Sequence, residues 1–301
     1  MVGTKTTLFL TGAHGWIGQA VRRAGQDRTD LEVCIVDRKA TANDWHAAFC
    51  GHEGQAVLLH LAWPSLQLAA ATATKDESLG RLLSDEQHWR DFLHWSTSLC
   101  TTAAQYGVRV VGVGSGIETY VDQQGESLGT AYLNYALQKR ELKAQMIAAA
   151  RSTFSWLRLH FLFGMGERPS RFVPAAIVAC GSGTTLSCGD LSRRRNWLAV
   201  DQAAALLCDF VQCAEDGEWD IAAHQDLSFA ELLSLIEQAV GERAVVASTM
   251  APTSDATLAL IHPQQLWPKI PEFLGNSASL LPHLRGYAQR LLQRNPSPGM
   301  T

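Results

Sequence analysis

The sequence lacks most of the features that mark secreted, membrane-spanning or metal-binding proteins. It has no run of about 18 apolar residues, so no transmembrane helix is predicted. Its seven cysteines form no Cys-x-x-Cys pair and no cysteine–histidine spacing typical of a zinc site. Only a few residues precede the first apolar segment, which leaves no room for a signal peptide. Because an odd number of cysteines favours reduced thiols, we expect a cytoplasmic protein without a metal.

The chain also carries little charge of either sign. Charged residues make up 18% of its 301 positions, and the formal net charge is -4. The only tight basic cluster is Arg193–Arg195, which is too short to line a nucleic-acid groove. We therefore expect a small-molecule substrate, and neither nucleic acid nor a membrane surface as a partner. The 47% of hydrophobic residues is enough to form a large core.

Short apolar segments alternate with amphipathic helices over the first two-thirds of the chain. The predicted strands are 7–11, 31–37, 56–62, 108–113 and 154–159. The predicted helices follow the first glycine turn up to about Ala24, where Gly25 is expected to end the helix, and cover 84–106 and 132–151. Between Asp37 and Ala56 a further strand fits poorly, and residues 44–50 supply about one turn of helix. This alternation predicts an α/β fold, a Rossmann-type doubly wound parallel sheet abbreviated at that edge.

The pattern is less regular after Gly164. A strand at 197–200, a helix at 201–213 and a strand at 219–223 are predicted. Ser228 is expected to cap a helix over 229–240 that Gly241 ends. We assign residues 1–164 with about 197–223 to a dinucleotide-binding domain. Residues 165–196 with 224–301 form a smaller, partly interleaved α/β substrate domain.

A glycine-rich turn lies between the first strand and the first helix, in the segment TGAHGWIG. The spacing G-x-x-G-x-x-G lets the backbone approach a pyrophosphate at a helix N-terminus. The predicted cofactor-binding residues of this turn are Gly12, His14, Gly15, Trp16, Ile17 and Gly18, with His14 an exposed loop residue. Asp37 closes the second strand, where a carboxylate accepts ribose hydroxyls and favours NAD. Arg38 and Lys39 follow at once and leave NADP open.

A tyrosine and a lysine share one face of the helix predicted after the fourth strand. Tyr135 and Lys139 are four residues apart, and an ammonium beside a phenol lowers the pKa of the phenol. Such a tyrosine can exchange a proton with an alcohol or carbonyl while a nicotinamide exchanges hydride. Tyr132 lacks this partner, because Ala136 stands four residues after it. Ser115 follows the fourth strand, where its hydroxyl can hydrogen-bond a substrate oxygen.

Together these segments resemble the extended short-chain dehydrogenase/reductase family, also called the NAD-dependent epimerase/dehydratase family. The resemblance runs from about Thr7 to Gly241. Its anchors are TGAHGWIG, Asp37, HLA at 60–62, Ser115, YALQK at 135–139, LRLHFLFGMG at 157–166 and RNWLAVDQAA at 195–204. It implies a Ser115–Tyr135–Lys139 catalytic triad, with Gly12, Gly15, Gly18 and Asp37 holding the dinucleotide. It further implies that Leu61, Ala62 and Trp63 line the nicotinamide side and that Arg195 clamps a sugar-nucleotide diphosphate.

The sequence departs from the family pattern at several of these positions. Ser115 precedes Tyr135 by only 20 residues, so Gly116 is the alternative for the serine position. Phe161 stands where sugar-nucleotide enzymes typically carry asparagine, and Trp63 replaces a small residue. Both bring apolar bulk towards the predicted substrate site. The acidic residues of the 4,6-dehydratases do not follow Ser115, which ranks a dehydratase below a reductase or an epimerase.

Three functions therefore stay open. The first is an NAD(P)-dependent ketoreductase or epimerase acting on a sugar-like, nucleotide-linked or free, hydroxyl or keto compound. The second is a reductase of a non-sugar ketone, which Trp63 and Phe161 favour. The third is a non-catalytic dinucleotide-binding sensor, against which the intact Tyr135–Lys139 pair argues. The resemblance also implies a homodimer through a four-helix interface, to which the helices at 84–106 and 132–151 would contribute.

Overall fold

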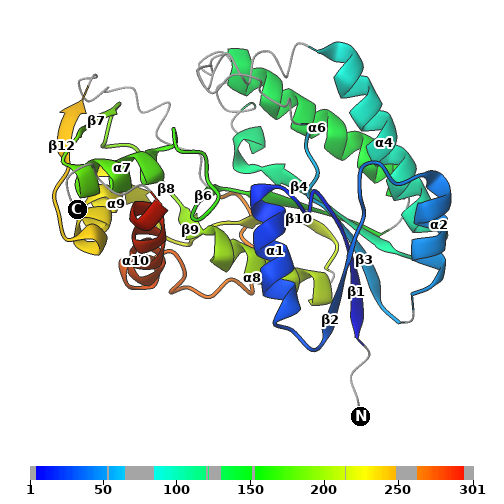
Figure 1. The fold of residues 1–301 in the computed structure, drawn as a ribbon. Helices are drawn as coiled ribbons and strands as arrows, with labels where there is room; N and C mark the ends of the chain where they lie inside the picture. The colour runs from blue at the N-terminus through cyan, green and yellow to red at the C-terminus, as the bar shows by residue number, and fades with distance from the viewer. Residues whose placement is uncertain are drawn as a thin grey trace. The chain divides into compact units, whose positions relative to one another are not determined.

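The computed structural model describes residues 5–52, 54–64, 85–119, 121, 130–150, 153–213, 215–248 and 263–294. The chain divides into two compact units, and each contains segments that are distant in the sequence (Figure 1). The first unit comprises Met1–Leu159 and Ala204–Asp220. The second comprises His160–Ala203 and Ile221–Thr301.

The first unit is built on a sheet of six strands in the order β10-β5-β4-β3-β1-β2. These strands are β1 (Thr6–Thr11), β2 (Leu31–Ile35), β3 (Ala56–His60), β4 (Arg109–Ser115), β5 (Phe154–Leu159) and β10 (Gly217–Ile221). β1 pairs in parallel with β2 and β3, and β4 pairs in parallel with β3 and β5. The Rossmann-type parallel sheet predicted from the sequence is confirmed.

Helices cover this sheet on both faces. They are α1 (Trp16–Gln26), α2 (Ala42–Cys50), α4 (Glu86–Gln105), α6 (Thr130–Ala150) and α8 (Val200–Cys213). Phe9 and Leu58 point from β1 and β3 into one apolar cluster with Trp45 of α2, Phe92 of α4 and Met146 of α6. α1 and α8 lie side by side on the other face, where Arg28 after α1 forms an ion pair with Asp209 of α8. Alternate residues of each buried strand therefore serve two different cores.

Two helices depart from their predicted bounds. Gly25 was expected to end α1, but it lies inside the helix, which continues to Gln26 and is capped at Asp27. Gly25 instead allows α1 to approach β2, because a Cβ there would lie 2.5 Å from Cγ2 of Val33. α2 is longer than the single turn predicted from residues 44–50. A capping box between Thr41 and Asp44 starts it at Ala42.

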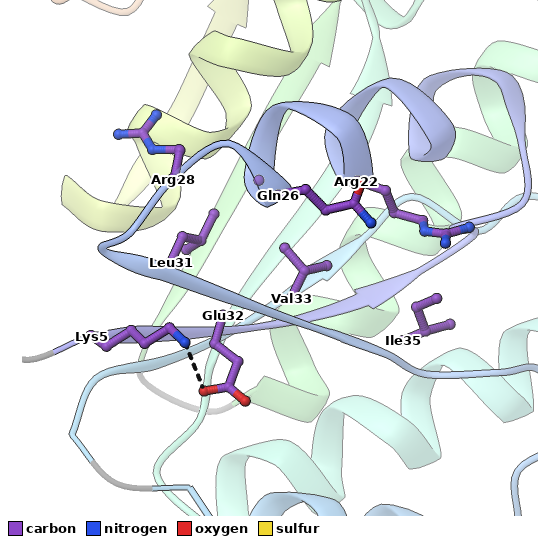
Figure 2. A pocket seen from close by; sticks show the side chains of 9 residues that line it. Lys5, Arg22, Gln26, Arg28, Leu31, Glu32, Val33 and Ile35 are labelled. Carbon is purple, nitrogen blue, oxygen red and sulfur yellow. Dashed lines mark ion pairs between the residues drawn. The ribbon is translucent and has the colours of Figure 1, made fainter.

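The sheet ends at β2, because the part of the interval from 37 to 56 that the structure describes contains no strand. The abbreviated edge was predicted from the length of this interval. Beside β2 lies a hollow of about 320 Å³, shown in Figure 2 with the Lys5–Glu32 ion pair at its rim. It is lined by Lys5, Arg22, Gly25, Gln26, Arg28, Leu31, Glu32, Val33 and Ile35. None of the predicted site residues lines this hollow.

In the part of the second unit that the structure describes, short two-stranded sheets are combined with the helices α7, α9 and α10. β6 (Phe161–Phe163) pairs in parallel with β9 (Trp197–Ala199), and β7 (Thr185–Cys188) with β12 (Val245–Ser248). β8 (Arg194–Arg195) pairs antiparallel with β11 (Leu227–Ser228). α7 (Phe172–Ser182), α9 (Phe229–Val240) and α10 (Ser277–Arg294) share one apolar core. The predicted Ser228 cap and Gly241 end of α9 are confirmed, whereas α7 and α10 were not predicted.

Two features are absent from the residues that the structure describes. No helix among them is both long and apolar enough to cross a bilayer. They also contain no group of three or more His, Cys, Asp or Glu side chains arranged to hold a metal ion.

Candidate active site

The turn after β1 brings three backbone segments into close contact. Gly12 adopts φ +68°, and a Cβ on it would lie 2.8 Å from the backbone nitrogen of Ala62. A Cβ on Gly18 would overlap the carbonyl oxygen of Gly12. The N–H of Gly15 donates to that same carbonyl at 2.9 Å. A side chain at position 12 or 18 would therefore displace the neighbouring backbone, whereas a Cβ on Gly15 would lie 3.2 Å from the Gly12 carbonyl oxygen.

Helix α1 begins at this turn without a capping side chain. Gly15 is its N-cap residue, no side chain hydrogen-bonds the cap, and the first turn contains no acidic residue. Trp16 and Ile17 are half-buried in that first turn, while His14 is exposed, as predicted. Uncapped amides and the helix dipole favour an anion at this end. The turn therefore fits the pyrophosphate of a dinucleotide, which needs backbone donors and no side chain in its path.

A buried histidine connects the ends of β1 and β3. Nδ1 of His60 lies 3.0 Å from the Thr11 hydroxyl oxygen, which also accepts the N–H of Ala62 at 3.1 Å. Burial, reinforced by the charge of Lys139, lowers the pKa of His60 to about 3, so the ring is neutral near pH 7. This contact holds Leu61 and Ala62 against Gly12. His60 was expected only as a family anchor, and this role of Thr11 was not predicted.

Asp37 and Arg38 follow β2 and are exposed. The Asp37 carboxylate accepts the N–H of Lys39 at 2.8 Å, which fixes the turn that leaves the sheet. The Arg38 guanidinium lies 5.7 Å from the ring centroid of Phe92. An accessible carboxylate at this strand end fits a ribose, and the cationic neighbours fit an added phosphate equally well.

Helix α6 brings Tyr135 and Lys139 together at Trp63. The Lys139 ammonium donates to the Val113 carbonyl at 2.9 Å and lies 4.1 Å from the Trp63 ring centroid. It lies 6.0 Å from the Tyr135 ring centroid. The Tyr135 and Trp63 rings meet edge-on, with centroids 5.1 Å apart and an interplanar angle of 77°. Three predicted site residues thus form one contact cluster.

Lys139 is buried away from solvent. Its side chain is only 5% exposed. Burial lowers the pKa of Lys139 to about 8, although the negative charge of Glu118 acts in the opposite direction. An ammonium with a pKa this near to neutrality responds to small changes in its surroundings.

Ser115 is the last residue of β4 and is half-buried. Its hydroxyl oxygen lies 3.5 Å from the backbone nitrogen of Ile117, and Gly116 opens the 3-10 turn η1 (Gly116–Thr119). The backbone N–H of Ser115 donates to the Glu118 carboxylate at 2.5 Å. Glu118 was not predicted as a site residue. The only sequence signal was an acidic residue three positions after Ser115.

Phe161 and Arg195 lie in the second unit and contact each other there. The Arg195 guanidinium lies 4.9 Å from the Phe161 ring centroid, and Arg195 is 7% exposed. Phe161 also packs edge-on against Trp197, at a centroid distance of 5.5 Å. Arg195 is therefore a buried, stacked arginine and not a solvated surface residue.

Nearly the whole chain is similar in fold to several solved structures. UDP-glucose 4-epimerase of Thermus thermophilus, in complex with NAD, is 16% identical with a TM-score of 0.66 over 95% of this chain and 98% of that chain. UDP-glucose-4-epimerase of Stenotrophomonas maltophila, with NAD and formylated UDP-arabinopyranose, is 17% identical with a TM-score of 0.68 over 96% and 99%. RMD of Pseudomonas aeruginosa, complexed with NADPH, is 14% identical with a TM-score of 0.66 over 96% and 99%. At these identities the likeness establishes the fold.

Sequence comparison establishes the family. No curated protein sequence matches the chain. The model of the NAD dependent epimerase/dehydratase family matches residues 8–221, more than two-thirds of the chain, and spans the glycine turn, Ser115, Tyr135 and Lys139. The chain therefore belongs to the NAD-dependent epimerase/dehydratase family, whose members are NAD(P)-dependent enzymes of the extended short-chain dehydrogenase/reductase type.

Proposed function

We propose that the protein is an NAD(P)-dependent epimerase or ketoreductase that acts on a sugar-like hydroxyl or keto compound through Ser115, Tyr135 and Lys139. The observation that carries this proposal is the cluster on α6. The Tyr135 phenol and the buried Lys139 ammonium share one helix face, and both contact Trp63. Trp63 is the last residue of the segment 61–63 that is expected to line the nicotinamide. This arrangement has the components of a proton-transfer site.

The residues at the ends of β1 and β2 fit the cofactor. Gly12, Gly15 and Gly18 leave the backbone bare for the pyrophosphate, and α1 presents its uncapped N-terminus there. Asp37 is the proposed ribose partner, and Arg38 and Lys39 beside it are compatible with both NAD and NADP. When bound, the nicotinamide supplies the hydride acceptor or donor. Of the three solved neighbours described above, two hold NAD and one holds NADPH, which supports either dinucleotide.

The catalytic roles are assigned from the chemistry of the three side chains. The Tyr135 phenol oxygen gives or takes the proton of the substrate hydroxyl or carbonyl. The Lys139 ammonium, anchored on Val113, favours the phenolate form of Tyr135 electrostatically. The Ser115 hydroxyl donates a hydrogen bond to the substrate oxygen as its charge changes.

A nucleotide-linked sugar is the substrate class with the most support. Two of the solved neighbours are named UDP-glucose 4-epimerases. Arg195 supplies a planar guanidinium of the kind that pairs with a diphosphate, and its stacking on Phe161 fixes the plane of that group. Phe161 and Trp63 favour a less polar ketone instead, so a non-sugar ketone is the second candidate.

We also propose a homodimer that pairs α4 and α6 with the same helices of a second copy. Two large apolar side chains of α6 support it, because Leu137 is 46% exposed and Ile147 is 45% exposed. Exposed residues of this size on one helix are typical of a surface that is covered by a partner.

Replacing Tyr135 by phenylalanine tests the catalytic proposal. The purified variant should lose about 10²- to 10⁴-fold in turnover of UDP-sugars and keto-sugars, because the proton-transfer group is gone while the ring remains. Its affinity for NAD(H), measured by fluorescence, should not change. Tyr132→Phe on the same helix is the matched control and should keep full turnover.

Two outcomes would contradict the proposal. Equal turnover of wild type and Tyr135→Phe would remove Tyr135 from the chemistry. Unchanged cofactor binding without turnover of any substrate in either form would identify the sensor function instead.

A further inference from the structure

A carboxylate is buried directly below the end of β4. Glu118 is 3% exposed, and both of its carboxylate oxygens are engaged. Oε1 accepts the backbone N–H of Ser115 at 2.5 Å, and Oε2 accepts Nε1 of the fully buried Trp156 at 2.8 Å. A Cβ on Gly114 would overlap Oε1, so the glycine provides the space that the carboxylate occupies. The position of this negative charge is therefore fixed on two sides.

The anchors of Glu118 and Lys139 lie two residues apart on β4. Glu118 holds the amide of Ser115, and Lys139 donates to the carbonyl of Val113. The ammonium also lies over the Trp63 ring, 4.1 Å from its centroid, and 6.0 Å from the Tyr135 ring centroid. A carbonyl dipole and an indole face do not neutralise a buried cation, which needs an opposite charge to offset its loss of hydration.

The electrostatic effects act in both directions between these two groups. Burial raises the pKa of Glu118, while the Ser115 amide and then the charge of Lys139 act to lower it. Burial lowers the pKa of Lys139, and the charge of Glu118 is what raises it. Each group therefore favours the ionised form of the other.

Other charged groups around this pair do not replace Glu118. His60, on β3, is neutral above a pKa of about 3. Arg158 on β5 and Lys143 on α6 are cations that also act on Glu118, and both have acidic partners of their own. Arg158 pairs with Asp220 and Glu218, and Lys143 pairs with Glu218.

We propose that Glu118 is a positioning residue of the active site, the counter-charge that keeps the Lys139 ammonium protonated while it fixes the backbone of Ser115. The inference rests on the proposed function only in that Lys139 is taken to serve Tyr135. Glu118 itself does not touch the substrate. Its one buried carboxylate acts on Lys139 through its charge and on Ser115 through a hydrogen bond.

Burial lowers the pKa of Lys139, and the charge of Glu118 raises it, so removing Glu118 should lower this pKa. Without the carboxylate, burial acts on the ammonium unopposed. The pKa of Lys139 then falls further below about 8, and the lysine loses its proton at a lower pH than in the wild type. A carboxylate that served only to hold Trp156 in place would leave this titration unchanged.

The test is an NMR titration of protein labelled with ¹³Cε-lysine, with Lys139→Met used to assign the resonance. In Glu118→Gln the Lys139 midpoint should move down by about one pH unit or more, as expected for the loss of a close opposite charge. Glu141→Gln is the matched control. The Glu141 carboxylate accepts Nε1–H of Trp89 at 2.7 Å. Glu141→Gln therefore removes the charge from the same kind of indole–carboxylate bond, on α6 instead of η1. Its Lys139 midpoint should equal that of the wild type.

The reciprocal measurement keeps the proposal falsifiable if Glu118→Gln does not fold. Because coupling between two sites is mutual, Lys139→Met should raise the pH at which the Glu118 carboxyl titrates, followed with ¹³Cδ-glutamate. An unchanged Glu118 midpoint in Lys139→Met would overturn the proposal. So would an unchanged Lys139 midpoint in a folded Glu118→Gln.

Neither titration needs a substrate, so the inference and the proposed function fail separately. If Tyr135→Phe keeps its turnover, the catalytic role is lost and the titrations still decide whether Glu118 sets the charge of Lys139. If the enzyme is active, the alkaline limb of its kcat/KM profile should move to lower pH in Glu118→Gln. Glu118→Asp, which retains the charge, should restore most of that shift.

Discussion

Two strand ends of the first unit are built on opposite principles. At the end of β1, the turn through Gly12 and Gly18 is formed by the absence of side chains, and the buried titratable group that contacts Thr11 there is the neutral His60. At the end of β4, the turn after Ser115 is formed around a buried carboxylate and a buried ammonium, Glu118 and Lys139.

The difference has a physical reason in what each end is proposed to hold. A pyrophosphate brings its own charge, so its site needs bare backbone donors and nothing in their way. A proton-transfer site must hold charge before the substrate arrives, so it has to bury ionised groups and offset their loss of hydration. The glycine turn after β1 should therefore tolerate substitutions nearby that change charge, but not the addition of a side chain to its glycines. A charged turn should tolerate small changes in bulk and not the loss of one charge.

The largest expected effect is the loss of stability when one partner of a buried ion pair is removed. Arg158 of β5 and Asp220 of β10 form a bidentate pair, and the Asp220 side chain is fully buried. Asp220→Ala should lower the free energy of unfolding by about 3–5 kcal/mol, because the buried guanidinium loses its bidentate, fully buried partner and keeps only the partly exposed Glu218. Urea denaturation measures this change.

Glu86→Ala is the matched control for that experiment. Glu86 pairs with Arg90 on the exposed surface of α4, and its loss should change the stability by less than about 0.5 kcal/mol. Equal effects of Asp220→Ala and Glu86→Ala would mean that burial does not set the strength of charge pairing in this unit.

The second largest effect is the loss of cofactor affinity when a side chain is added to the glycine turn. A methyl group at Gly18 would overlap the Gly12 carbonyl, so the turn must open. Gly18→Ala should weaken NAD(H) binding about 100-fold, a loss of about 2.7 kcal/mol, measured by isothermal titration calorimetry. Gly51→Ala is the control, because a Cβ there meets its nearest neighbour at an ordinary 3.6 Å. Wild-type affinity in Gly18→Ala would show that the turn does not hold the cofactor.

The smallest effect concerns the one titratable group buried at the bare turn. His60 has a folded-state pKa of about 3, below its ordinary value of 6.5. Between these two values the unfolded chain binds a proton that the folded chain does not, so stability falls as the pH falls. The slope should approach about 1 kcal/mol per pH unit below pH 6. His60→Gln should flatten it in urea midpoints measured from pH 7 to pH 5.

His94→Gln, on the exposed side of α4, is the control for this measurement and should keep the wild-type slope. If His60→Gln also keeps that slope, the acid sensitivity comes from other groups. The neutral character assigned to the bare turn would then be wrong.

The parallel sheet of the first unit was predictable because each strand is an apolar segment that needs cover on both faces. β5 begins and ends where it was predicted, at Phe154 and Leu159. The Ser228 cap and the Gly241 end of α9 were equally predictable, since both depend on the residue itself. Gly25 misled the prediction. Its missing side chain lets α1 pack against Val33 of β2, and only the tertiary structure brings these two elements together.

The sequence by itself determined the strands of the first unit's sheet, the glycine turn and the spacing of Tyr135 and Lys139, because these depend on residues within a few positions of one another. The tertiary structure alone decided which groups share the buried space at the end of β4. Glu118, Trp156 and Lys139 come from three separate segments, and each side chain is ordinary on its own. Charge, burial and hydrogen-bond partners are properties of a shared environment, and that environment exists only once the strands are packed side by side.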